Sequence, residues 1–423
     1  YTDGGGTAES VTSAATAPVT NTNDAPTGDV LVTGSASQGE TLQADASGLA
    51  DADGLGPFAY SWLRDGTPIP GASGSTYTLT QGDVGAQLSV EVSYTDGGGT
   101  AESVTSAATA PAEGAGIPIV GTPDPDDLVG TLGADTIQGA ASDDTLTGGK
   151  GDDLLDGGAG TDTAVFSGDR ANHTVTISPG GLTVEDRRAD GSGTDSVSGI
   201  ERFAFGNGDW QADKFTGVAG LSEEAFRDFV EVYVAYFNRA PDAEGLFFYG
   251  TVFATGTSLE DSAATFLNSD EYRAAYDGLS NEDFATAVYN NVLGRIPDPA
   301  GFNFWVGLLD DGKVGRDSFI LKVLEGAKAE PKPGASQEFI DQQLADRDYL
   351  ANKTDIGIYY AVTKGMSDVE NATTAMGLFD GTEDSVTDAR DAIDGFYADA
   401  LDPENGEFLL QLIDVVDDPF AVA

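Results

Sequence analysis

Short runs in which apolar and polar residues alternate dominate the first quarter of the chain. This period of two predicts β-strands with one buried face. The runs cover residues 30–33, 60–63, 77–80 and 88–94. The dipeptides Asp65-Gly66 and Asp96-Gly97 are typical of tight turns between such strands. Trp62 lies in a central run and is the expected core residue of this all-β region.

The opening segment of the chain is repeated. Residues 1–18 recur without change at residues 94–111, an offset of 93 residues. That spacing is about the size of an immunoglobulin-like β-sandwich. We therefore expect residues 20–112 to form one Ig-like sandwich, and residues 1–19 to be the terminal strand or strands of a preceding copy. Tandem domains of this kind make extended stalks.

This region also resembles the bacterial Ig-like and cadherin-like repeats of large adhesins. The resemblance depends on the motifs NTNDAP at 21–26, LADADG at 49–54 and SWLRDG at 61–66. In related modules, acidic residues at domain junctions bind calcium, which makes Asp24, Asp51 and Asp53 candidate ligands here. Ordinary Asx turns at a junction explain the same residues equally well.

Residues 121–165 divide into five units of nine residues. Every unit begins with Gly, has Asp at its sixth place and an apolar residue at its eighth. The aspartates are Asp126, Asp135, Asp144, Asp153 and Asp162, and the leading glycines are Gly121, Gly130, Gly139, Gly148 and Gly157. The pattern resembles the GGxGxDxUx repeat of RTX parallel β-rolls. The resemblance implies a calcium-binding roll, to which we assign residues 113–166.

The spacing predicts which aspartates meet. A unit of six turn residues and three strand residues makes half a coil, so turns on one side come from units i and i+2. Asp135 then pairs with Asp153 on one side, whereas Asp144 pairs with both Asp126 and Asp162 on the other. Carboxylates and turn carbonyls together suit Ca²⁺, a hard cation that prefers oxygen ligands.

Glycines in the turns are expected to aim the carbonyl oxygens inward. They are Gly133, Gly149, Gly151, Gly158 and Gly160. The fourth and fifth units match the repeat well, whereas the first contains two prolines and the third has Ala140, Ala141 and Ser142 where glycine would help. We favour the pair Asp135 and Asp153 as the best site. A disordered Gly/Asp-rich linker would not keep this register over five units.

Apolar–polar alternation continues through residues 167–213, with glycine turns between the runs. The stretch resembles the segment that follows RTX repeats in secreted proteins. That resemblance implies a cap of antiparallel strands that covers the open edge of the roll.

From about Ser222 the apolar period changes to that of α-helices. A set of residues recurs there at an offset of 56. Tyr233, Arg239, Pro241, Asp242, Gly245 and Phe248 return as Tyr289, Arg295, Pro297, Asp298, Gly301 and Phe304. Each copy predicts a helix, a tight Arg-x-Pro-Asp turn and a second helix. We expect the aromatic residues to form a bundle core and the two arginines to brace their turns.

Residues 214–334, with YFNRAPDAEG at 236–245 and LGRIPDPAG at 293–301, resemble a helical family of uncharacterised function that often accompanies RTX repeats. They are distantly similar to helical domains that anchor alphaproteobacterial S-layers to lipopolysaccharide. Residues 335–423 continue as amphipathic helices. The end of the chain, EFLLQLIDVV and DDPFAVA, resembles an uncleaved type I secretion signal; a terminal helix docked on the bundle is compatible with that reading.

Composition narrows the function. Acidic residues outnumber basic ones 71 to 20, and a net charge of -51 argues against a nucleic-acid partner. The absence of Cys excludes catalytic thiols and cysteine zinc sites. The single histidine, His173, makes histidine triads and histidine-held metals implausible and is expected to be a surface or packing residue. No apolar run is long enough to cross a bilayer.

The fold class expected from all this is multidomain, with an Ig-like sandwich, a parallel β-roll with an antiparallel cap, and an all-α helical bundle. The expected function is that of a secreted, calcium-dependent structural protein at a Gram-negative cell surface, an adhesin or an S-layer or filament subunit. It would be exported by a type I machinery and is not an enzyme. Self-assembly and binding to lipopolysaccharide or another surface polysaccharide are further expectations. The alternative is the secretion and folding region of an RTX enzyme or toxin whose catalytic domain lies upstream.

Overall fold

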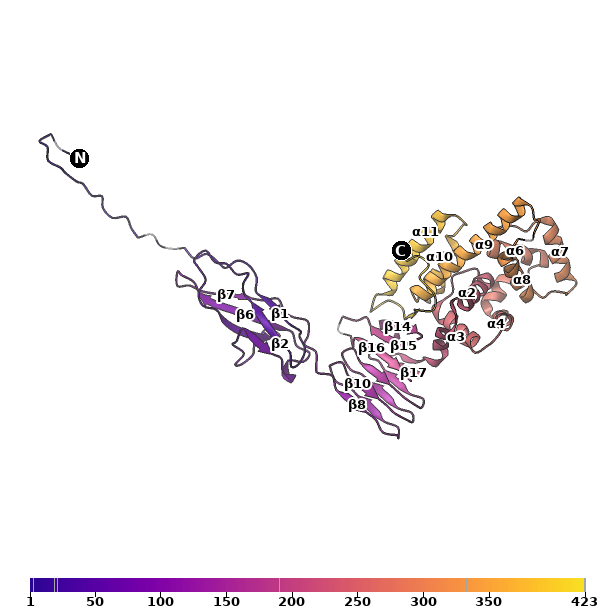
Figure 1. Cartoon of the computed structure of the whole chain (residues 1–423), viewed down its shortest axis with the longest axis horizontal. Helices are drawn as coiled ribbons and strands as arrows, with labels where there is room; N and C mark the ends of the chain where they lie inside the picture. Colours follow the sequence, from indigo (N-terminus) through magenta and orange to yellow (C-terminus); the bar gives the residue numbers. More distant parts are fainter. Residues whose placement is uncertain (3, 19, 21, 190, 332, 422–423) are drawn as a thin grey trace. The chain divides into compact units, whose positions relative to one another are not determined.

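The computed structural model describes residues 1–2, 4–18, 20, 22–189, 191–331 and 333–421. The chain forms two compact units, Tyr1–Ala115 and Gly116–Ala423, each with its own hydrophobic core (Figure 1).

Two antiparallel sheets share the core of the first unit. Their strand orders are β1-β2-β5 and β4-β3-β6-β7. The strands are β1 (Leu31–Thr33), β2 (Thr41–Asp45), β3 (Ala59–Arg64), β4 (Thr67–Pro68), β5 (Thr76–Thr78), β6 (Leu88–Thr95) and β7 (Ala101–Thr105), with a 3₁₀ turn at Gln81–Asp83. Trp62 is fully buried, and its Nε1 donates a hydrogen bond to the carbonyl of Gly74 at 3.0 Å, so its predicted core role is confirmed. Asp65 and Gly66 form the predicted turn, with φ angles of 48° and 77°.

The two copies of the repeated segment have different structures. In residues 94–111 the segment supplies the end of β6 and all of β7, which pair in the sheet. In residues 1–18 every described residue is exposed, and one isolated bridge joins Thr2 to Ala8. The equivalent residues of the second copy, Thr95 and Ala101, are paired in the same way. The same pairing is thus present in both copies, whereas the strands that continue it are present in the second.

The second unit begins with a parallel β-roll. Its strands alternate between two sheets, β8-β10-β12 and β9-β11-β13. They are β8 (Pro118–Val120), β9 (Asp127–Val129), β10 (Thr136–Gln138), β11 (Thr145–Thr147), β12 (Leu154–Asp156) and β13 (Thr163–Val165). Ile137 lies opposite Leu155, and Leu146 opposite Ala164; all four are fully buried. This register confirms the predicted stacking at intervals of 18 residues.

The cap is both antiparallel and parallel. It contains a 3₁₀ turn (Arg170–Asn172), β14 (His173–Ser178), β15 (Gly181–Asp186), β16 (Thr194–Ser198), β17 (Arg202–Phe205) and β18 (Gly208–Gln211). The pairs β14–β15, β15–β16 and β17–β18 are antiparallel, as the alternation predicted. However, β16 and β17 also pair in parallel with β12 and β13. The cap therefore adds strands to both sheets of the roll.

The remainder is helical until the last strand. The helices are α1 (Asp213–Thr216), a 3₁₀ turn (Gly217–Gly220), α2 (Glu223–Phe237), α3 (Ala243–Ala254), α4 (Leu259–Phe266), α5 (Asp270–Tyr276), α6 (Asn281–Leu293), α7 (Pro299–Asp310), α8 (Arg316–Lys328), α9 (Gln337–Ile358) with a π-helical extension (Tyr359–Thr363), α10 (Val369–Gly377) and α11 (Glu383–Ala400). Ser222 caps α2 by accepting a hydrogen bond from the Ala225 amide, which explains where the helical period begins. Roll, cap and helices share one continuous core.

The duplicated motif forms two equivalent turns, between α2 and α3 and between α6 and α7. Arg239 donates to Glu271 Oε1 at 2.6 Å and to the Ala240 carbonyl at 2.8 Å. Arg295 likewise donates to Asp346 Oδ1 at 2.7 Å. Both arginines thus brace their turns, as expected from the sequence. The repeated Asp-x-x-Gly pattern has a capping role. Asp242 caps α3 by accepting a hydrogen bond from the amide of Gly245 at 2.6 Å.

The end of the chain is a strand and not the terminal helix considered from the sequence. Leu409–Leu412 form β19, which pairs in parallel with β14, so that Val175 lies opposite Leu410. The seven-stranded sheet therefore runs β19-β14-β15-β16-β12-β10-β8. An apolar run such as FLLQLI suits a helix or a buried strand, and the distant edge of β14 decides between them.

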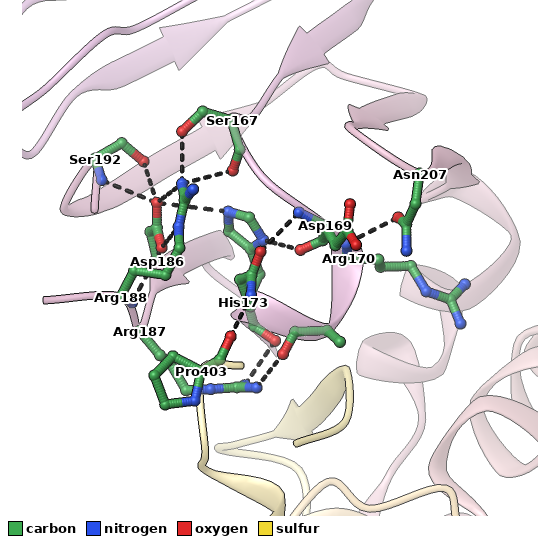
Figure 2. A network of polar contacts seen from close by, with 12 residues as sticks. Ser167, Asp169, Arg170, His173, Asp186, Arg187, Arg188, Ser192, Asn207 and Pro403 are labelled. Atoms are coloured by element: carbon green, nitrogen blue, oxygen red, sulfur yellow. Dashed lines mark hydrogen bonds and ion pairs between the residues drawn. The ribbon is translucent and has the colours of Figure 1, made fainter. Parts of the chain in front are cut away.

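A polar network surrounds His173 and Arg187 in the cap (Figure 2). Arg187 donates to the carbonyls of His173 and Glu407, each at 2.7 Å, and so spans β14 and the residue that leads into β19. His173 is fully buried between aromatic rings, and its Nδ1 donates to the Asp169 carbonyl at 3.0 Å. Burial lowers the pKa of His173. The only histidine is thus a packing residue.

Candidate metal site

The repeat aspartates form two ladders of hydrogen bonds along the roll. On one side Asp153 Oδ1 accepts from the Asp135 amide at 2.7 Å. On the other side Asp144 Oδ1 accepts from the Asp126 amide at 2.8 Å, and Asp162 Oδ1 from the Asp144 amide at 2.7 Å. The aspartates that the spacing pairs therefore lie in neighbouring turns. One carboxylate oxygen of each of these three side chains is used in this way.

The leading glycine of each unit makes room for the aspartate of the same unit. A Cβ atom at Gly148 would lie 2.1 Å from Asp153 Oδ2, and one at Gly139 would lie 2.5 Å from Asp144 Oδ2. Neither glycine has a positive φ angle. These glycines therefore serve to admit a carboxylate against the backbone, which is a steric role distinct from turn flexibility.

The second carboxylate oxygen divides the five aspartates into two classes. In the first two units a threonine follows the leading glycine, and its amide and hydroxyl donate to Oδ2 of Asp126 and of Asp135. In the last three units, Oδ2 of Asp144, Asp153 and Asp162 is buried and has no hydrogen-bond partner among the described residues. We call the first class closed aspartates and the second class open aspartates.

Backbone conformation follows the same division. The closed units have no positive φ angle in their described turns, whereas each open unit has two. The residues are Ala140 and Ser142, Gly149 and Gly151, and Gly158 and Gly160, with φ between 72° and 158°. Of the predicted turn glycines, Gly133 alone lies in a closed unit and lacks this conformation. The open turns therefore have a backbone that the closed turns do not adopt.

Burying the unpartnered oxygen of an open aspartate costs free energy unless a cation or water binds it. A buried polar atom that lacks a partner is rare in native proteins and calls for an ion or water. Burial raises the pKa of Asp153 to about 6 and raises that of Asp162, the result expected when a carboxylate is desolvated without a compensating positive charge. Oxygen donors in a turn of this kind fit a hard cation such as Ca²⁺. The residues present therefore fit calcium.

Carboxylates alone do not build the cage. Within the described residues no group of three or more Asp, Glu, His or Cys side chains is placed to hold a metal ion. A cation at an open turn would take its remaining ligands from backbone carbonyls, as the sequence spacing implied. The favoured pair, Asp135 and Asp153, contains one closed and one open aspartate, because Thr131 donates to Asp135 Oδ2. Asp135 Oδ1 accepts from the Ile117 amide at 2.6 Å.

Sequence reasoning missed two acidic residues that continue the ladders. Asp195 Oδ1 accepts from the Asp153 amide at 2.9 Å, and Glu201 Oε2 accepts from the Asp162 amide at 2.8 Å. A signal for Asp195 was present, because Gly193-Thr-Asp-Ser-Val197 repeats the fourth to eighth places of a unit. For Glu201 the local sequence offers no such signal.

The junction candidates come together in the first unit. The Asp53 carboxylate accepts from the Asp24 amide at 2.8 Å, and Asp51 Oδ1 accepts from the Asp53 amide at 2.8 Å. Asp51 Oδ2 also accepts from the Tyr94 hydroxyl at 2.6 Å. The bond between Asp51 and Asp53 is an Asx turn. The carboxylates of Asp51 and Asp53 are thus engaged by donors of the protein itself, whereas Asp24 takes part through its backbone amide.

Comparison with known families agrees with the roll. Residues 129–164 match the model of the RTX calcium-binding nonapeptide repeat in four copies. The chain carries RTX repeats. These repeats indicate calcium binding and a secreted RTX-type protein. Residues 263–330 match a domain of unknown function, DUF4214, which spans the second copy of the duplicated motif. Among the described helices, none is both long and apolar enough to cross a membrane.

One curated relative is the decoration protein of Escherichia phage T5. It is 43% identical over 56 residues, which are 13% of this chain and 31% of the relative. The match thus spans less than a third of that protein's length. No solved structure matches the chain.

Proposed function

We propose that this chain is part of a secreted structural protein of a bacterial surface, whose β-roll is locked by Ca²⁺ outside the cell. The observation that best supports this proposal is that Asp144, Asp153 and Asp162 each have one buried carboxylate oxygen without a hydrogen-bond partner among the described residues. Calcium would neutralise these carboxylates and supply the missing partner. Cytosolic calcium is low, so the free energy of binding would become free energy of folding only after export.

A structural role is favoured over catalysis. The one histidine is fully buried against Phe166 and Phe205 and so is withheld from any substrate. The repeated segment in the first unit favours a tandem array, which separates two ends in space. In this proposal the first unit is an Ig-like module, the helical part anchors or assembles the protein, and export uses a type I machinery.

Calcium titration of the full chain tests the proposal. Circular dichroism, thermal melting and light scattering would be followed as Ca²⁺ is added, with Mg²⁺ as the control cation. We expect calcium to raise β content and the melting temperature, since it binds the folded roll and not the unfolded chain. Growth in particle size with calcium would favour an assembling surface layer over a single stalk. An unchanged spectrum and melting temperature would refute the calcium-locked roll.

A further inference from the structure

We propose that Asp195, which lies outside the nine-residue repeats, completes a calcium site with Asp153 where the roll meets the cap. The inference rests on the proposed calcium-dependent function and adds a ligand that the repeat pattern does not contain. The repeat period would place the next aspartate on this side at residue 171, which is alanine. The structure instead brings in a residue that follows Asp153 by 42 positions.

Strand pairing puts Asp195 in the ladder. Leu155 of β12 lies opposite Ile137 of β10 on one edge and opposite Val197 of β16 on the other, both in parallel. Asp195 therefore stands two residues before Val197, just as Asp153 stands two residues before Leu155. The hairpin of β14 and β15 is inserted between these coils and leaves their stacking intact.

The turn that precedes Asp195 stacks like a repeat turn. The Gly151 amide donates to the Ser192 carbonyl at 2.8 Å, and the Thr194 amide donates to Asp152 Oδ1 at 2.8 Å. Gly193 has a φ of 110°, close to the 106° of Gly151 at the equivalent place. A Cβ atom at Gly193 would lie 2.5 Å from the Gly151 carbonyl oxygen. The cap thus reproduces the close backbone approach of an open unit.

Both carboxylates are withdrawn from water. Asp153 is 2% exposed and Asp195 is 3% exposed. Asp153 Oδ2 has no hydrogen-bond partner among the described residues, although its other oxygen accepts from Asp135. An unpartnered oxygen beside a second buried carboxylate is the arrangement that a bound divalent cation relieves, because the cation offsets both charges.

The substitution Asp195→Asn tests the site. Asparagine keeps an oxygen that can accept from the Asp153 amide but removes the charge. Asp209→Asn is the matched control, since Asp209 is an exposed carboxylate of the same cap. Calorimetric titration of the full chain with Ca²⁺ should show that Asp195→Asn loses about one bound ion, or binds it at least about tenfold more weakly, a loss of about 1.4 kcal/mol. Asp209→Asn should bind as the unaltered chain does.

The outcomes separate this site from the function it rests on. If the unaltered chain binds no calcium, the proposed function itself fails. If the unaltered chain binds calcium and Asp195→Asn binds the same number of ions equally tightly, only the Asp195 site is overturned. Should Asp195→Asn fail to fold, hydrogen exchange of the unaltered chain decides. Calcium should then slow the amides of residues 191–198 as much as those of residues 148–156, and exchange that calcium leaves unchanged in 191–198 would also overturn the site.

Discussion

At the scale of single residues, the residue after the leading glycine separates the two kinds of aspartate. Threonine at this place donates hydrogen bonds to the carboxylates of Asp126 and Asp135 within the same turn. Alanine or glycine there leaves Asp144, Asp153 and Asp162 with a buried oxygen that nothing in the described chain satisfies. The two classes are invisible in the aspartate spacing, which is the same in every unit.

This difference predicts unequal effects of one substitution. Asp162→Asn should weaken calcium binding by at least about tenfold, because it removes the charge of an open aspartate; such a loss corresponds to about 1.4 kcal/mol. Asp126→Asn should change calcium affinity little, since the amide and hydroxyl of Thr122 already donate hydrogen bonds to that carboxylate. Calorimetric titration of both variants measures the difference. Equal losses in the two variants would show that the closed aspartate also binds the ion.

His173 predicts a loss of stability in mild acid. Burial lowers its pKa, so the folded protein holds the neutral ring while the unfolded chain protonates with a pKa of about 6.5. The contribution of neutral His173 is therefore complete above that pH and is lost as the pH falls below it. Melting temperatures in saturating calcium should fall between about pH 7.5 and 5.5 in the unaltered chain. His173→Phe, which preserves an aromatic ring, should flatten this part of the profile, and a profile of unchanged steepness would contradict the assignment.

At the scale of elements, the third unit of the roll is strained. Ala140 and Ser142 have φ angles of 85° and 72°, a region that costs residues other than glycine roughly 1–2 kcal/mol each. Ala140→Gly should therefore stabilise the calcium-loaded protein by about 1 kcal/mol. Gly158→Ala, at the equivalent place in the fifth unit, should destabilise it by more, because its Cβ would lie 2.4 Å from the Ala140 carbonyl oxygen. Thermal melting of both variants shows whether each substitution raises or lowers the melting temperature. A melting temperature raised by Gly158→Ala would contradict this account.

The elements also show how much of the fold the sequence predicts. Trp62, the parallel strands of the roll, the helix that begins after Ser222 and the arginine-braced turns follow from short-range patterns, and each is confirmed. Those patterns work because turn chemistry, capping and face periodicity are local. The pairing of β19 was not predicted because its partner β14 is far away in sequence. Asp195 carries a partial repeat motif, but it follows Asp153 by 42 residues and so falls outside the nine-residue register.

The repeated segment shows the same limit within one chain. The bridge between Thr2 and Ala8 matches that between Thr95 and Ala101, so this pairing is present in both copies. The strand that follows forms in the second copy, where Val104 pairs with Val92 of β6. The strand in the second copy thus depends on pairing with β6 and not on the local residues alone.

At the scale of the whole molecule, the two units predict two unfolding transitions. Each has its own core, and the open aspartates all lie in the second unit. Differential scanning calorimetry of the full chain should show that calcium shifts one transition upward and leaves the other unchanged. An equal shift of both transitions would mean either that the units unfold together or that the first unit also binds calcium.

The continuous sheet predicts that calcium acts on the end of the chain. The hydrogen-bonded path runs from β12 through β16, β15 and β14 to β19, and Arg187 ties the Glu407 carbonyl to β14. Because hydrogen-bonded strands of one sheet often open together as a cooperative unit, a calcium ion that stabilises the roll should also slow exchange in Leu409–Leu412. Hydrogen exchange of the full chain with and without calcium measures this effect.

Arg187 separates this coupling from calcium binding itself. Arg187→Gln removes a buried guanidinium that donates to several carbonyls, which should cost on the order of 3 kcal/mol. It should speed exchange in β19 while the roll still binds calcium, since no repeat aspartate contacts Arg187. Arg202→Gln is the control, because its 4.0 Å ion pair with Asp209 is exposed. If β19 exchanges at the same rate with and without calcium in the unaltered chain, the strand docks independently of the roll, and the sheet transmits no stabilisation to it.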